Sequence, residues 1–226
     1  MDDASFQHDV VHSNVNDAIE AIEGELGTNP KGAQATVKDR LNLMARVDGR
    51  SVIGWPTGRY ATNNFLFGST AASQTLSANT VYYTPWRCPQ SVTIDRIAIE
   101  ISTGAAGNAR IGIYNSLSSD YPGTLLLDAG TVDTTAAAVK ELTISQALTG
   151  GVLYWLALHP SAGPQARGAA GGGILTMTRA DTVSGFGMAR IYESYAYASG
   201  LPTTATTTPT DGSDTAYPPV FWMRRA

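Results

Sequence analysis

Cysteine, histidine and charge are all scarce in this chain of 226 residues. Because there is 1 cysteine, one chain can form neither an internal disulfide nor a thiolate metal cluster. That residue, Cys88, stands beside a predicted strand end, where we expect a buried, unreactive thiol. Charged residues make up 15% of the sequence and the net charge is −4, without the basic surplus of proteins that follow phosphates. We therefore expect no nucleic-acid partner.

Long hydrophobic runs are also missing. No stretch approaches the ~18 uninterrupted apolar residues that a membrane helix needs. The chain begins Met1-Asp2-Asp3, which is acidic where a secretory signal is basic and then apolar. We expect synthesis in a cytoplasm, no membrane insertion, and release, if any, by a route other than secretion.

The composition changes near Asp48-Gly49-Arg50. Residues 1–50 hold 9 acidic and 5 basic groups, whereas residues 51–226 hold 10 of each. Eighteen of the 19 aromatic residues and 19 of the 23 glycines lie after residue 50. This shift predicts two parts: a stem over 1–50 and one larger domain over 51–226.

The stem has the hydrophobic spacing of two short helices. The first is expected to begin at a cap on Ser13 or Asn14 and to stop at Gly27, and the second to begin near Thr36. Each apolar stripe spans about two heptads, too little for a stable isolated coiled coil, so the helices need partners. We expect self-association, with a trimer as the first expectation and fivefold symmetry as the alternative. The residues expected at the contact are Val15, Ile19, Ile22, Leu26, Val37, Leu41 and Met44.

From residue 51 the hydrophobic period becomes two, which is typical of strands. Val92 and Ile94 alternate, and Ile97, Ile99 and Ile101 continue on the opposite parity, which predicts a β-bulge at Asp95-Arg96. A hairpin is expected at 104–108, and a central strand buried on both faces over 152–158. The fold expected is mainly β: an antiparallel, jelly-roll-like β-sandwich behind a short helical stem. Further strands are expected at 79–84, 111–113, 124–128, 139–144, 174–178, 186–192 and 219–224, with loops at 161–173 and 200–218.

Closely spaced tyrosines precede the second long loop and suggest a ligand site. Sugar rings present C–H faces that pack on aromatic rings, while carboxylates and small polar groups bind their hydroxyls. The alternative is that these rings fill the core or a contact between subunits. With no cluster of arginine or lysine there, a neutral glycan fits better than a polyanion. The predicted glycan-binding residues are Tyr192, Tyr195, Tyr197, Asp211, Asp214 and Tyr217.

Catalytic and metal sites have weaker sequence support. His8 and His12 have the spacing of metal ligands on a helix, but one chain offers no third ligand, so we expect neither a metal site nor a cofactor. His159 has no Gly-x-Ser-x-Gly element to accompany it. No pair stands out among the candidate acids, so we expect no enzymatic activity. These acids are Asp95, Glu100, Asp128, Glu141 and Glu193.

Two segments of the chain carry recognisable combinations of motifs. The first has His12-Ser13-Asn14-Val15-Asn16-Asp17, then Leu26-Gly27-Thr28-Asn29-Pro30, then Ala35-Thr36-Val37 and Arg40-Leu41, and resembles a segment near the start of tail-fibre and minor virion proteins. The second has Ser91-Val92-Thr93-Ile94, Ala109-Arg110-Ile111-Gly112, Tyr121-Pro122-Gly123 and Tyr154-Trp155-Leu156, and resembles β-sandwich domains at the ends of phage fibres, which are often compared with carbohydrate-binding modules. Together the segments cover about half the chain.

The resemblance implies a homotrimeric fibre or head-spike protein on the exterior of a virion, with residues 1–50 attached to other virion proteins. The β-domain would then bind a host-surface glycan. Two alternatives stay open: a virion depolymerase of polysaccharide, and a structural adaptor or decoration protein.

Overall fold

The computed structural model describes residues 4–26, 29–30, 35–38, 55–62, 70–119, 121–170, 191–206, 210–211 and 217–226. The chain divides into two compact units, Met1–Val52 and Ile53–Ala226. This division lies within a few residues of the boundary expected from composition.

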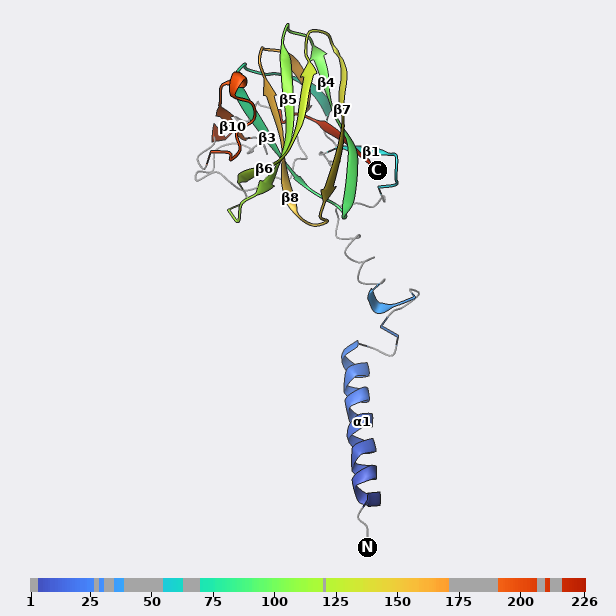
Figure 1. Cartoon of the computed structure of the whole chain (residues 1–226). Helices are drawn as coiled ribbons and strands as arrows, with labels where there is room; N and C mark the ends of the chain where they lie inside the picture. The colour runs from blue at the N-terminus through green and yellow to red at the C-terminus, as the bar shows by residue number, and fades with distance from the viewer. Residues whose placement is uncertain are drawn as a thin grey trace. The chain divides into compact units, whose positions relative to one another are not determined.

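The first unit contains helix α1, Ala4–Leu26 (Figure 1). The cap expected at Ser13 or Asn14 is wrong, because the helix already begins at Ala4 and both residues lie inside it. The preceding residues contain neither glycine nor proline, so nothing in the sequence stops the helix from extending backwards. At the other end the helix stops at Leu26, directly before Gly27, as expected.

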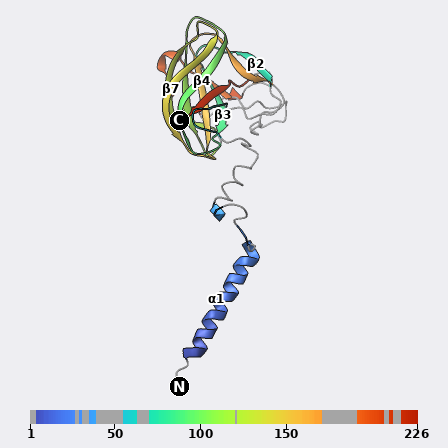
Figure 2. The same ribbon diagram turned by 90° about the vertical axis from the view of Figure 1, so that its right-hand side faces the viewer.

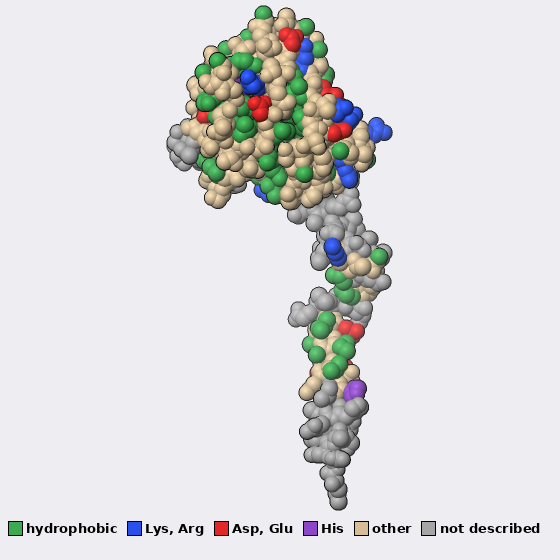
Figure 3. All heavy atoms as spheres, viewed as in Figure 1, with side chains coloured by type: hydrophobic (Ala, Val, Ile, Leu, Met, Phe, Trp, Pro, Cys, Tyr) green, Lys and Arg blue, Asp and Glu red, His purple; other side chains and the backbone are tan. Residues whose placement is uncertain are grey.

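The apolar stripe of α1 lies on its surface. Val15, Ile19 and Ile22 are 50%, 49% and 57% exposed, and hydrophobic side chains are visible along the described part of the helix in Figure 3. Val37 is also exposed. The side chain of Leu26 and all of Leu41 and Met44 lie outside the described residues.

The second unit is a sandwich of two antiparallel sheets, so the expected mainly β architecture behind an N-terminal helix is confirmed (Figures 1 and 2). Sheet A has the order β1-β12-β4-β9-β2, with β7 on the other side of β4. Its strands are β1 Tyr60–Thr62, β2 Thr70–Thr75, β4 Val92–Thr103, β7 Ala138–Leu148, β9 Gln165–Ala170 and β12 Phe221–Arg225. Sheet B has the order β11-β10-β3-β8-β5-β6. Its strands are β3 Thr80–Arg87, β5 Asn108–Ser116, β6 Pro122–Asp133, β8 Leu153–Pro160, β10 Ile191–Ser194 and β11 Thr210–Asp211.

The main core lies between the sheets and follows the predicted alternation. On β4, Ile94 and Ile97 are both 0% exposed, and the register with β7 shifts between Ile94 and Arg96. This irregularity confirms the predicted bulge, which turns two consecutive side chains, Asp95 and Arg96, toward solvent. All eight residues of β8 are buried, which confirms a central strand covered on both faces. Val152, expected at its start, instead precedes the strand and is 40% exposed.

Two expectations about connections are wrong, and a third is only partly right, because the loop expected at 200–218 contains the two-residue strand β11. The hairpin expected at 104–108 is a crossover, because β4 lies in sheet A whereas β5 lies in sheet B. The loop expected at 161–173 contains β9, which pairs with β2 and β4. These strands are held mainly by backbone hydrogen bonds between small and polar residues, a pattern that hydrophobic periodicity does not detect. The strands expected at 174–178 and over most of 186–192 lie outside the described residues.

Candidate functional site

The face of sheet B that points away from sheet A carries a second apolar cluster. Tyr83, Tyr114 and Trp155 project there, and each is at most 1% exposed. A sheet face bearing such large rings must be covered. The cover is the segment of residues 195–206, whose Leu201 and Ala205 complete the cluster. We call it the covering segment.

Backbone hydrogen bonds tie the covering segment to sheet B at both ends. The Tyr195 N–H donates to the Asn79 carbonyl oxygen at 2.9 Å, and the Ala205 N–H donates to the Gly123 carbonyl oxygen at 2.9 Å. The buried Tyr114 hydroxyl donates to the Pro202 carbonyl oxygen at 2.7 Å. The segment therefore has a defined place on the sheet.

Glycine at position 112 allows the covering segment to approach β5. A Cβ atom added to Gly112 would stand 2.5 Å from Leu201 Cδ1 and 3.1 Å from the Leu127 carbonyl oxygen. Any side chain here would displace Leu201, so the missing Cβ is what lets the segment pack directly on the strand.

His159, on β8, lies beneath the covering segment and is 0% exposed. Its Nδ1 is 3.0 Å from the Gly200 carbonyl oxygen, and its Nε2 is 2.9 Å from the Tyr195 carbonyl oxygen. Burial lowers the pKa of His159, although hydrogen bonding to these two oxygens works in the opposite direction. The rings of Tyr195 and Tyr197 pack around the imidazole, with centroid distances of 6.1 and 5.2 Å.

Arg110, the neighbour of His159 on β5, adds charge to this group. Its Cζ atom lies 5.4 Å from the centroid of the Tyr197 ring. One of its terminal nitrogens is 3.6 Å from Asp128 Oδ2, while Asp128 Oδ1 accepts a hydrogen bond from the Gly130 N–H at 3.0 Å. Among the described residues, buried Arg110 Nε has no hydrogen-bond partner. We call Arg110, Asp128, His159, Tyr195 and Tyr197 the tyrosine site.

The structure brings together some of the predicted glycan-binding residues and separates others. Tyr195 and Tyr197 lie together and are both partly exposed. Tyr192 instead packs against the core between the sheets, with its ring centroid 6.2 Å from that of Tyr82. Tyr217 lies beside β2 of sheet A, where its N–H donates to Gln74 Oε1 at 2.8 Å. Asp211 is described only by its backbone, which pairs with Ile191, and Asp214 lies outside the described residues.

Sequence reasoning missed Arg110 as a member of the site. Asp128 and His159 were considered only as candidate catalytic groups. The alternation along β5 could show that Arg110 shares a face with Tyr114, but only the pairing of β5 with β6 and β8 places it beside Asp128 and His159.

The groups considered as catalytic candidates have structural partners. The carboxylate of Glu193 accepts hydrogen bonds from the Tyr83 hydroxyl and the Thr206 N–H. Glu100 pairs with Arg167 across β4 and β9. Both ring nitrogens of His159 face backbone carbonyl oxygens rather than a hydroxyl or thiol. These groups therefore hold strands and segments together.

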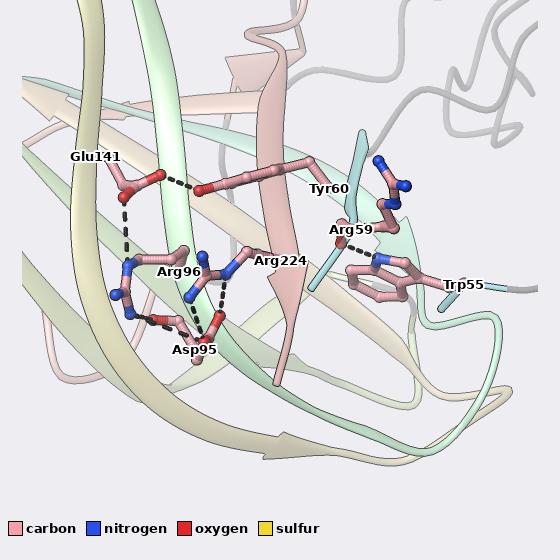
Figure 4. A network of polar contacts seen from close by, with 7 residues as sticks. All are labelled: Trp55, Arg59, Tyr60, Asp95, Arg96, Glu141 and Arg224. Carbon is pink, nitrogen blue, oxygen red and sulfur yellow. Dashed lines mark hydrogen bonds and ion pairs between the residues drawn. The ribbon is translucent and has the colours of Figure 1, made fainter. Parts of the chain in front are cut away.

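A second polar group lies on sheet A and joins four strands (Figure 4). Arg224 on β12 donates two hydrogen bonds to Asp95 on β4, at 2.9 and 2.6 Å. Arg96 Nε lies 3.3 Å from Glu141 on β7, and the Tyr60 hydroxyl of β1 donates to the same carboxylate. Two arginines and two carboxylates balance in charge. We call these five residues the sheet A network; its pairings indicate a structural role.

Among the residues that the structure describes, no group of three or more histidine, cysteine or acidic side chains could hold a metal ion. His12 is exposed on α1, and the side chain of His8 is not described. Burial raises the pKa of Cys88 to about 11, consistent with the predicted inert thiol. None of the described helices is long and apolar enough to cross a membrane.

Comparison with known proteins adds no family. No protein-family model matches the chain, and no curated protein sequence matches it.

Proposed function

We propose that this protein is a non-enzymatic, oligomeric fibre or spike component on the exterior of a phage or phage-like particle. In this proposal residues 1–50 join copies of the chain and attach them to other virion proteins, and the β-sandwich binds a host-surface glycan. The virion setting rests on the two sequence segments that resemble phage fibre proteins.

The observation that carries the proposal is the exposed apolar stripe of α1. Val15, Ile19 and Ile22 recur on one face and are about half exposed in the single chain. Full burial of a side chain of this size contributes about 1.5–3 kcal/mol of free energy. A helix that exposes three of them on one face therefore favours a partner that covers them. Copies of the same helix meeting around a symmetry axis provide that partner most simply.

The sandwich supports a binding rather than a catalytic role in this assembly. Its candidate acids are engaged with arginines, tyrosines or backbone N–H groups. The tyrosine site, in contrast, combines partly exposed aromatic rings with polar side chains on a firmly tethered segment, which is a common arrangement in ligand recognition.

Self-association is tested by light scattering on the full chain at micromolar concentration. We expect wild type to be an oligomer, with three chains as the first expectation, and the Ile19→Asp, Ile22→Asp variant to be a monomer, because buried carboxylates would lie unpaired at the contact. The matched control is Ser13→Asp, Ala21→Asp, which adds the same charge on the opposite face of α1 and should leave the oligomer intact. A stable wild-type monomer would contradict the proposed assembly.

A further inference from the structure

Arg110 and Asp128 form an incompletely satisfied polar pair beside a partly exposed ring. Their 3.6 Å separation is too long for a hydrogen bond, whereas Arg224 and Asp95 in the sheet A network meet at 2.6 and 2.9 Å. The side chains of Arg110 and Asp128 are 30% and 37% exposed, so solvent reaches the pair. Buried Arg110 Nε remains without a hydrogen-bond partner among the described residues. Among the described residues, the solvent-exposed ends of the two side chains thus keep hydrogen-bonding capacity for a ligand.

The chemistry of this pair selects a hydroxyl group. A hydroxyl oxygen accepts a hydrogen bond from a guanidinium and donates one to a carboxylate, so a single hydroxyl can bridge two groups that stand too far apart to bond directly. A ligand carboxylate would bond to Arg110 but would repel Asp128. Because the pair carries one positive and one negative charge, it favours an uncharged ligand.

The aromatic ring beside the pair selects a ligand with a flat C–H face. Arg110 lies over the Tyr197 ring, and His159 packs against the same residue. Tyr197 is also fixed through its backbone, since its N–H donates to Asn79 Oδ1 at 2.9 Å. A ring that is already held in place loses little conformational freedom when a ligand packs on it.

We propose that Arg110, Asp128 and Tyr197 form a subsite for a neutral sugar ring. One hydroxyl bridges Arg110 and Asp128, and the C–H face of the sugar packs on Tyr197; His159 holds the covering segment in place from below. This inference rests on the proposed glycan-binding function. It places the sugar on residues of β5, β6 and the covering segment, in place of the set of residues predicted from the sequence. Tyr192 and Tyr217 do not take part.

The test is saturation-transfer difference NMR on the full-length protein. The probes are the methyl glycosides of glucose, galactose, mannose and N-acetylglucosamine, with methyl glucuronide as the acidic comparison. We expect transfer to the ring protons of at least one neutral glycoside and less transfer to the glucuronide. Tyr197→Ala and Asp128→Asn should each weaken binding about tenfold or more, the size expected when a hydrogen bond to a charged group or an equivalent contact is lost.

Matched variants separate binding from folding. Asp128→Asn keeps an oxygen to accept from Gly130, and Tyr197→Phe keeps the ring, so Tyr197→Phe should bind like wild type. Tyr60→Ala removes a 45% exposed tyrosine from the sheet A network and should leave sugar binding unchanged. Unchanged melting temperatures of Tyr197→Ala and Asp128→Asn would show that the sandwich is intact in both variants.

The outcomes for the subsite and for the proposed function can be told apart. If the wild-type oligomer binds host cells but no neutral glycoside shows transfer, or if transfer survives Tyr197→Ala and Asp128→Asn, the subsite is overturned and the adhesion role stands. If glycoside binding depends on both residues but the oligomer does not bind host cells, the subsite stands and the adhesion role is overturned.

Discussion

His159 has hydrogen-bond partners that a neutral imidazole cannot satisfy together. Both ring nitrogens lie within 3.0 Å of backbone carbonyl oxygens, and a neutral ring carries one N–H group. The charged ring would donate to both oxygens, but burial opposes the charge. Arg110 on β5 also lowers the pKa of His159, whereas Glu193 on β10 raises it. Burial is the largest of these effects, so the pKa of His159 lies below its ordinary value.

This lowered pKa predicts a loss of stability in acid. As pH falls below the ordinary histidine value of 6.5, the unfolded chain takes up the proton before the folded chain does, so the free energy of unfolding decreases. We expect wild type to lose more stability than His159→Gln between about pH 7 and about pH 5, where histidine titrates. Urea unfolding at a series of pH values measures the difference.

His12→Gln is the matched control for the pH series, because it removes a histidine from the exposed surface of α1. It should follow the wild-type curve. Parallel curves for wild type and His159→Gln would show that the buried imidazole has no such effect.

At the scale of secondary-structure elements, the sheet A network links strands that are distant in sequence. The bulge in β4 presents Asp95 and Arg96 on the same side; Asp95 then reaches β12 and Arg96 reaches β7. The hydrogen bonds from Arg224 hold the pKa of Asp95 below its usual range. Since β12 lies between β1 and β4, this contact fixes the last strand of the chain in the sheet.

Removal of this contact should destabilise the sandwich. We expect Asp95→Asn to lower the melting temperature, with a smaller effect at high salt because the pair is partly exposed and therefore screened. The wild-type advantage should also shrink as acid protonates Asp95, since a carboxylate with a lowered pKa stabilises the fold only while it is charged. Thermal melts across salt concentration and pH measure both effects.

A double-mutant cycle provides the control for this prediction. If Asp95 and Arg224 stabilise the fold through their mutual contact, Asp95→Asn should lower the free energy of unfolding only slightly in a protein that already carries Arg224→Gln. Fully additive losses in the two single variants would mean that the contact contributes nothing of its own.

At the scale of the whole molecule, the hydrophobic core and the proposed assembly stripe belong to different units. Every member of both hydrophobic clusters lies between Trp55 and Met223, within the unit Ile53–Ala226. Trp55, near the start of this unit, is buried and packs at right angles to Trp86 with ring centroids 6.3 Å apart. Arg225, near its end, donates to the Trp55 carbonyl oxygen at 2.6 Å. Contacts near the two ends of this unit thus hold them together, and its first and last described strands, β1 and β12, pair with each other.

We therefore expect a fragment of residues 53–226 to fold alone and to remain monomeric. Its melting curve should be cooperative, and light scattering should show one chain at concentrations where the full-length protein associates. A fragment that fails to fold would show that the sandwich needs the helical unit. A fragment that forms the full-length oligomer would place the assembly contact on the sandwich instead.

The sequence by itself determined the features that depend on neighbouring residues. The bulge in β4 and the double burial of β8 follow from local spacing, because the period of the hydrophobic pattern mirrors the geometry of the backbone. The end of α1 follows instead from the stop signal at Gly27. The buried state of Cys88 also agrees with its apolar setting.

The tertiary structure alone decided features that depend on long-range pairing. Strand β9 forms from small residues because β2 and β4 supply its hydrogen bonds, and the 104–108 segment crosses between the sheets instead of forming a hairpin. The tyrosine site joins Arg110 to Tyr197, which is 87 positions away in the chain. No local pattern encodes that meeting: it requires β5 to pair with β8 and the covering segment to pack across both strands. For the same reason, three tyrosines that stand close together in sequence divide between two faces of one sheet.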